Sequence, residues 1–244
     1  MKRTFADLHL RLDSRDILNV RRTIDKIAKL GYGLVGVPFS LETMETELAT
    51  FQEICGEAGV SLVSRVDLRP RSRGQLMYLL RKLRRRFDVV CVLCESKEVA
   101  RQAAKDKRVD LLNFPVVDYN KRFFDWAEAE LASKTAVAFE VDAKLLFVLE
   151  GPTRVRFLSC LRREVSIALE FGVPIVVSSG VSKGLLLRKP LELAAFTGMF
   201  GLGEVAGLDT VSVNPVQIVE RNRLKLARGF VAPGIRVVKD GVDC

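Results

Sequence analysis

Histidine is nearly absent from this sequence: its 244 residues contain only one, His9. Ser-His-Asp enzymes use histidine as their general base, and catalytic zinc sites commonly use several histidines as ligands. A single copy therefore excludes most metallohydrolases and most hydrolases built on such a triad. For His9 we expect a hydrogen-bonded structural side chain rather than a catalytic base.

Long apolar runs are also lacking. The most apolar stretch, residues 191–208, is interrupted by Glu192 and Glu204 and falls short of the roughly 18 residues that a transmembrane helix needs. The N-terminus reaches Asp7 before the apolar region of a signal peptide could form. We therefore expect a soluble protein of the cytoplasm.

Cysteines are few, and their spacing does not predict a metal site. They are odd in number and scattered, as is typical of reduced thiols: Cys55, Cys91, Cys94, Cys160 and Cys244. Cys91 and Cys94 form a C-x-x-C pattern within an apolar run that predicts a buried strand. Side chains three residues apart on a strand point to opposite faces, so these two thiols cannot share a metal ion.

Short apolar runs alternate with amphipathic stretches along the whole chain. We predict strands over residues 5–10, 33–38, 60–66, 88–93, 110–113, 135–141, 174–178 and 210–213. Helices are predicted between and after them, over residues 17–30, 41–58, 74–86, 96–106, 122–132, 154–171, 190–200 and 216–228. Eight such units favour a single (β/α)₈ TIM-type barrel over residues 1–230, with a C-terminal tail at 231–244. The first strand-to-helix turn has no glycine, which argues against a dinucleotide-binding open sheet.

The predicted barrel mouth carries carboxylates but little else that could catalyse. Acidic residues lie at the ends of three of the strands: Asp67, Glu95, Glu140 and Asp142. A pair of them could act as acid and base in principle. No second histidine stands beside them, however, and hydrolysis of nucleic acid by a protein usually requires a recognisable metal site.

Positive charge is abundant and confined to one part of the chain. Between Arg69 and Arg108 there are 13 basic and 4 acidic residues, so this window alone accounts for the net charge of +9. We predict that it forms an RNA-binding basic face on neighbouring outer helices of the barrel, made of Arg69, Arg71, Arg73, Arg81, Lys82, Arg84, Arg85, Arg86, Lys97, Arg101, Lys105, Lys107 and Arg108.

The composition of this window indicates how it would bind. Arginine dominates, and its guanidinium can contact two phosphate oxygens at once. Tyr78 and Phe87 are the aromatic residues of the helical part, and we expect both in the core. Binding should therefore follow the backbone and shape of the nucleic acid rather than stack on its bases.

The opening segment 5–11 resembles the first strand of polymerase-and-histidinol-phosphatase-type barrels, in which Asp-Leu-His-x-His supplies two metal-binding histidines. This chain keeps Asp7, Leu8 and His9 but has Arg11 at the second histidine position. The resemblance thus implies the same barrel with its metal site lost and no metal or other cofactor bound by the chain.

A basic, metal-free version of that barrel is similar to the p30-type protein subunits of ribonuclease P, above all to archaeal ones. The segments that carry the resemblance are 5–9, 110–114, 138–141, 174–180, 189–195 and 213–215. The resemblance implies a non-catalytic subunit of an endoribonuclease that removes the 5′ leader from precursor tRNA, with Mg²⁺-dependent cleavage by the RNA subunit. Implied partners are the catalytic domain of that RNA, a small RRM-like subunit (component 2) and other ribonuclease P proteins, with precursor tRNA contacted indirectly and no membrane.

Two alternatives remain at this point. One is a stand-alone metal-dependent phosphoesterase that uses Asp7, His9, Glu140 and Asp142. The other is an interaction module whose basic window binds an acidic protein.

Overall fold

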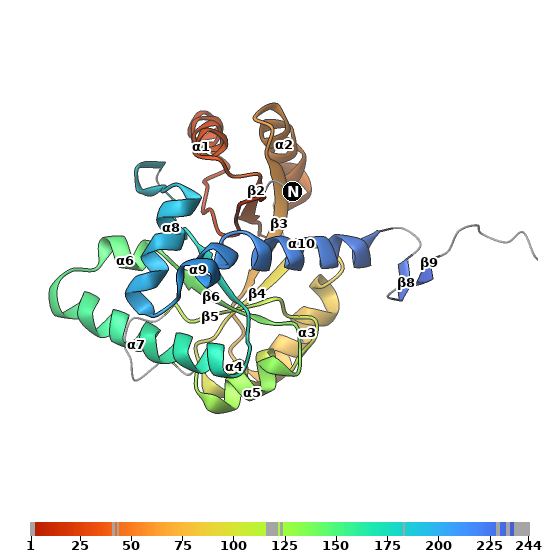
Figure 1. The fold of residues 1–244 in the computed structure, drawn as a ribbon. Helices are drawn as coiled ribbons and strands as arrows, with labels where there is room; N and C mark the ends of the chain where they lie inside the picture. The colour runs from red at the N-terminus through yellow and green to blue at the C-terminus, as the bar shows by residue number, and fades with distance from the viewer. Residues whose placement is uncertain are drawn as a thin grey trace, which may run out of the picture.

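Seven parallel strands form the centre of the molecule in the computed structural model (Figure 1). The structure describes residues 3–40, 42, 44–115, 122, 124–182, 184–227, 230–232 and 235–236. Each strand pairs with the next in chain order, from β1 to β7: Ala6–Asp7, Leu34–Pro38, Ser61–Leu68, Val89–Leu93, Leu111–Asn113, Ala138–Asp142 and Ile175–Ser178. This order is the one that crossover helices impose on successive parallel strands.

Helices surround the sheet and are separated from it by a large apolar core. They are α1 (Ile17–Leu30), α2 (Met44–Glu57), α3 (Arg73–Leu83), α4 (Lys97–Ala104), α5 (Trp126–Ser133), α6 (Lys144–Val148), α7 (Gly151–Glu170), α8 (Pro190–Phe196), α9 (Glu204–Thr210) and α10 (Val213–Leu226), with short 3₁₀ turns η2 (Gly184–Leu186) and η3 (Thr197–Phe200). Ser72 and Ser96 cap the N-termini of α3 and α4 by accepting backbone N–H bonds. No helix among the described residues is both long and apolar enough to cross a lipid bilayer.

The sheet curls into a nearly closed barrel, so the predicted fold class is confirmed. The seam between β1 and β7 is bridged just beyond the two strands, where Gly180 N–H donates to His9 O at 2.9 Å and Arg11 N–H donates to Val181 O at 3.0 Å. Asp7 adds to this closure, because its Oδ1 accepts from the backbone N–H of Ser179 at 3.0 Å.

The predicted eighth strand, residues 210–213, is not a strand in the structure. Thr210 ends α9 and Val213 begins α10, so the segment is the tight link between two helices. One hydrogen bond, from Ala6 N–H to Val211 O at 2.9 Å, stands where an eighth strand would have paired.

Helix α10 lies across the end of the barrel where the strands begin. Ile218 and Val219 of this helix belong to the apolar cluster inside the barrel. Polar side chains of α10 donate to carbonyls at or just before the starts of β7, β6, β4 and β3: Asn214 to Ile175, Arg221 to Ala136, Asn222 to Asp88 and Arg223 to Leu62. This end is therefore closed, and only the opposite mouth can present interior groups to a ligand.

Strand β4 shows the alternation expected of a barrel wall. Val89, Cys91 and Leu93 face the interior cluster, whereas Val90 and Val92 face the helices. Cys94, just after the strand, also belongs to the outer cluster. The prediction that Cys91 and Cys94 point to opposite faces is thus confirmed.

After α10, strands β8 (Phe230–Ala232) and β9 (Ile235–Arg236) form a small antiparallel hairpin. The rest of the predicted tail, 233–234 and 237–244, lies outside the described residues. The division into a barrel at 1–230 and a tail at 231–244 stays a prediction.

Candidate functional site

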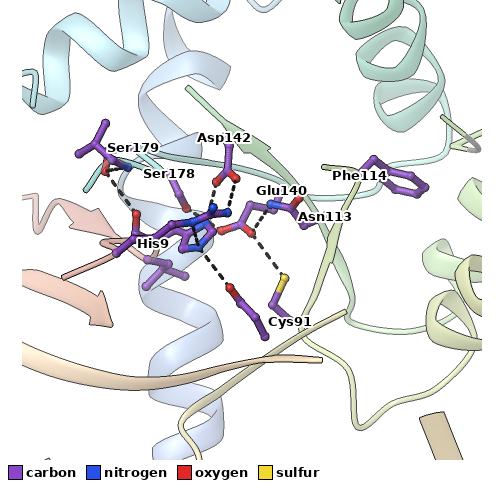
Figure 2. Close-up of polar contacts among 12 residues, drawn as sticks. His9, Cys91, Asn113, Phe114, Glu140, Asp142, Ser178 and Ser179 are labelled. Atoms are coloured by element: carbon purple, nitrogen blue, oxygen red, sulfur yellow. Dashed lines mark hydrogen bonds and ion pairs between the residues drawn. The ribbon is translucent and has the colours of Figure 1, made fainter. Parts of the chain in front are cut away.

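The open mouth of the barrel contains a cluster of buried charges contributed by three strands (Figure 2). The segment around β1 supplies Asp7 and His9, and β6 supplies Glu140 and Asp142. The structure brings together three of the four residues that the phosphoesterase alternative requires, His9, Glu140 and Asp142, while the Asp7 carboxylate accepts from the backbone N–H groups of His9 and Ser179. Among the acidic residues predicted at the barrel mouth, Glu95 lies apart from this cluster, on the exposed rim, and pairs with Arg69 at 3.4 Å.

Arg65 on β3 occupies the centre of this cluster, and sequence reasoning did not identify it. Its side chain is completely buried. Its guanidinium binds both carboxylate oxygens of Glu140, at 2.5 and 2.7 Å, and Nε donates to Asp67 Oδ1 at 2.6 Å. A further bond reaches the carbonyl of Leu8 at 2.9 Å. The guanidinium therefore joins three strands of the barrel through charge-assisted hydrogen bonds.

Glu140 has no free lone pair left for an additional cation. Besides Arg65, its oxygens accept from Asn113 Nδ2 at 2.9 Å and from Ser178 Oγ at 2.8 Å, while Cys91 Sγ lies 3.5 Å away. Burial is the largest influence on the Cys91 thiol and raises its pKa well above the ordinary value, so that the thiol stays protonated.

His9 is fully buried between two carboxylates. Nδ1 lies 2.7 Å from Asp142 Oδ1, and Nε2 lies 3.2 Å from Asp67 Oδ2. Burial and the charge of Arg65 lower the pKa of His9, but the two carboxylates outweigh both and raise it to about 9. Arg11 Nε donates to His9 Nε2 at 3.0 Å, and its Nη2 lies 3.4 Å from Asp142 Oδ2, so Arg11 and His9 share the Asp142 carboxylate.

A metal ion does not fit this cluster, although three potential ligands lie close together. Ligand atoms of His9, Glu140 and Asp142 are all within 4.8 Å of one another. A metal-binding histidine must be neutral, whereas the carboxylates of Asp142 and Asp67 raise the pKa of His9. The carboxylate of Glu140 is already neutralised by a buried guanidinium, which would repel a dication. The buried charges of the described residues thus largely compensate one another, with Arg65 facing Glu140 and His9 facing Asp142.

The residues of the predicted basic face lie on two adjacent outer helices and in the segments that flank them. Helices α3 and α4 pack against each other, and the Met77 Sδ of α3 contacts both Gln102 of α4 and Arg108 just beyond it at 3.3 Å. Most of the predicted residues are exposed, namely Arg69, Arg71, Arg73, Arg81, Lys82, Arg85, Arg86, Lys97, Arg101, Lys105 and Lys107.

Some members of the face have structural partners. The side chains of Arg84 and Arg108 are largely buried and pair with Asp110 at 3.5 Å and Asp106 at 2.7 Å. Three exposed members also form ion pairs: Arg69 with Glu95, Arg86 with Glu45 and Arg101 with Glu128. The others form no ion pair within the described part of the chain, and they are the ones available to an external anion: Arg71, Arg73, Arg81, Lys82, Arg85, Lys97, Lys105 and Lys107.

The prediction that Tyr78 lies in the core is wrong, whereas Phe87 is buried as expected. The buried stripe of α3 consists of Leu76, Leu80 and Leu83. Tyr78 follows Leu76 by two positions, which is more than half a helical turn, so its ring lies on the outer side of α3. It is 62% exposed and stands among the basic side chains.

Comparison with known proteins places this arrangement in a family. The family model of ribonuclease P subunit p30 matches residues 4–227. The ribonuclease P protein component 3 of Methanosarcina barkeri is 30% identical over 220 residues, which are 90% of this chain and 91% of that protein. The corresponding protein of Methanosarcina mazei is 32% identical over 181 residues, 74% of each chain.

Solved structures agree on the fold. A chain in a cryo-EM structure of archaeal ribonuclease P with mature tRNA superposes with a TM-score of 0.84 at 20% identity, covering 96% of this chain and 99% of that one. A putative prolidase of Bifidobacterium longum superposes with a TM-score of 0.56 at 11% identity, covering 90% and 70%. From the match of the p30 model to nearly the full barrel, this chain belongs to the ribonuclease P subunit p30 family.

Proposed function

We propose that this chain is an RNA-binding subunit of ribonuclease P that supports the catalytic RNA in removing the 5′ leader from precursor tRNA. The observation that carries the proposal is the basic face at α3 and α4. Its exposed side chains are positively charged, and most of them lack carboxylate partners. Such a surface fits a polyphosphate backbone, since each neutralised phosphate releases counterions and adds to affinity.

The barrel interior supports a non-catalytic role. In the proposed assembly the RNA performs the Mg²⁺-dependent cleavage, and this chain binds no metal or other cofactor. The network around Arg65 and Glu140 favours this view, because the charge that a catalytic cation would supply is already present as a guanidinium. The phosphoesterase alternative has one feature in its favour, the proximity of His9, Glu140 and Asp142, and is not better supported than the subunit role.

The partners of the chain are part of the same proposal. We propose that it contacts the catalytic domain of the ribonuclease P RNA, pairs with the small RRM-like subunit (component 2) and meets precursor tRNA indirectly. We place this assembly in the cytoplasm. Cys55, Cys91 and Cys94 are buried free thiols, which agrees with a reducing compartment.

A charge-reversal variant tests the basic face directly. Arg81, Lys82 and Arg85 are replaced together by glutamate in the full chain, and binding to the ribonuclease P RNA is measured over a range of salt concentrations. We expect weaker binding and a log–log salt slope reduced by about 2 to 3, since each lost phosphate contact removes roughly 0.7 to 0.9.

The matched control reverses three exposed cations on other helices, Arg22, Lys29 and Arg156. This control has the same net charge as the test variant. It should bind RNA more tightly than the test variant does, with a log–log salt slope closer to that of the wild type. Equal losses in the two variants would show that only the total charge matters and would contradict a specific face. If reversal of Arg81, Lys82 and Arg85 left RNA binding unchanged but abolished binding of an acidic protein, the alternative of a protein-interaction module would be favoured.

A further inference from the structure

Tyr78 is an exposed aromatic side chain in the middle of the basic face. Its relative exposure is 62%, and its hydroxyl forms no hydrogen bond with the described residues. The ring therefore contributes little to the core that α3 builds through Leu76 and Leu80. A large apolar ring left in water on a helix is informative when its surroundings point to one kind of partner.

One of the two positions toward which Tyr78 leans carries no side chain. Helical side chains lean toward the N-terminus of their helix, so Tyr78 extends over the positions three and four residues earlier, Gln75 and Gly74. Gly74 has no side chain, and a Cβ built there would meet nothing closer than Ser72 Oγ at 4.0 Å. The helix surface at Gly74 is thus open.

The other neighbours of Tyr78 along the helix are cations. Arg81 and Lys82 follow it by three and four residues, which places both on the same side of α3, and Arg85 lies in the turn just beyond the end of the helix. All are exposed, and none forms an ion pair with a described residue. The segment from Arg69 to Phe87 contains no carboxylate that could neutralise them.

We propose that Tyr78 is a stacking site for one unpaired nucleotide of RNA, with Arg81, Lys82 and Arg85 binding the flanking phosphates. This inference rests on the proposed RNA-binding role and names the kind of RNA element that the face accepts. A nucleotide combines a planar apolar surface with neighbouring negative charges, which is the complement of this patch. In an RNA duplex the bases are stacked on both sides and lie in a deep, narrow groove, so only an unpaired base can reach the ring.

The experiment compares single-stranded and duplex RNA of the same length. Fluorescence anisotropy at one fixed salt concentration measures binding of a labelled single-stranded oligoadenylate and of a labelled RNA duplex to the full chain. The variants are Tyr78→Ala and Tyr78→Phe, with Leu191→Ala as a control that truncates an exposed apolar side chain on α8.

We expect Tyr78→Ala to weaken single-strand binding by about 5- to 150-fold, which corresponds to the loss of one base–aromatic stack. Duplex binding should change less than about twofold, because the cations remain. Tyr78→Phe keeps the ring and should bind like the wild type, as should Leu191→Ala.

Single-strand affinity of Tyr78→Ala within about twofold of the wild type would overturn the stacking site, and so would equal losses on single strand and duplex. If Tyr78→Ala left both RNAs bound but weakened association with another ribonuclease P protein, the ring would be a protein contact and the inference would be wrong. The charge-reversal variant separates this failure from that of the proposed function, which stands as long as reversal of Arg81, Lys82 and Arg85 reduces RNA binding.

Discussion

Replacement of Arg65 by methionine should destabilise the barrel more than any surface change on the basic face. Methionine has a similar length but leaves Glu140 buried without a counter-charge, and it also removes the bond from Arg65 Nε to Asp67. Removal of one partner from a buried ion pair typically costs about 3 to 5 kcal/mol. We expect the upper part of this range, because one guanidinium serves two carboxylates here. The loss is large against a typical unfolding free energy of roughly 5 to 15 kcal/mol.

Urea unfolding followed by far-UV circular dichroism measures this loss at pH 7. The second variant, Arg65→Met with Glu140→Gln, removes the uncompensated charge as well and should recover much of the stability.

Two results would refute this reasoning. A loss below about 1 kcal/mol for Arg65→Met would show that the guanidinium does not compensate the buried carboxylates. A double variant no more stable than the single one would show that the loss comes from packing rather than from an uncompensated charge.

Three further predictions concern the same barrel. The pKa of His9 in the folded protein is about 9, above its ordinary value of 6.5, so its contribution to the free energy of unfolding should be complete below pH 6.5 and disappear as the pH rises toward 9. Urea unfolding of His9→Gln at several pH values should lack this loss of stability. Gly36→Ala should destabilise the protein by about 1 to 3 kcal/mol or more in the same urea assay, since its Cβ would lie 2.4 Å from the Leu8 carbonyl oxygen. Gly56→Ala on α2 is the control: its Cβ meets nothing within 4 Å, and the change should stabilise by about 0.4 to 1 kcal/mol. Excess Mn²⁺ should leave the thermal midpoint of the wild type unchanged, and stoichiometric Mn²⁺ binding by calorimetry would revive the phosphoesterase alternative.

The barrel and its basic face could be predicted because both depend on local patterns. Alternating apolar runs and amphipathic stretches determine strands and helices, and neighbouring helices in such a fold are neighbours in the sequence. The charge of the window from Arg69 to Arg108 is visible by simple counting. The segment 210–213 resembled a strand by its apolar content, but its role as a link into α10 depends on how that helix closes the barrel.

Contacts between distant residues could not be predicted in this way. Arg65 pairs with Glu140, 75 positions later, and nothing in the local pattern of β3 identifies that partner. A lone arginine within an apolar strand is the one available signal, since a buried charge requires compensation. The misplacement of Tyr78 has a different cause: its ring was assigned to the core by its apolar character, although its position on the helix places it opposite the buried stripe.

Reconstituted cleavage of precursor tRNA tests the central claim most directly. The ribonuclease P RNA is assayed at moderate Mg²⁺ with component 2, with and without this chain, and the chain is also assayed alone. The account predicts faster removal of the 5′ leader when the wild-type chain is added, a smaller gain with the Arg81, Lys82 and Arg85 reversal, and no cleavage without RNA. Cleavage by the chain alone, or an RNA-dependent rate that the chain leaves unchanged, would contradict it.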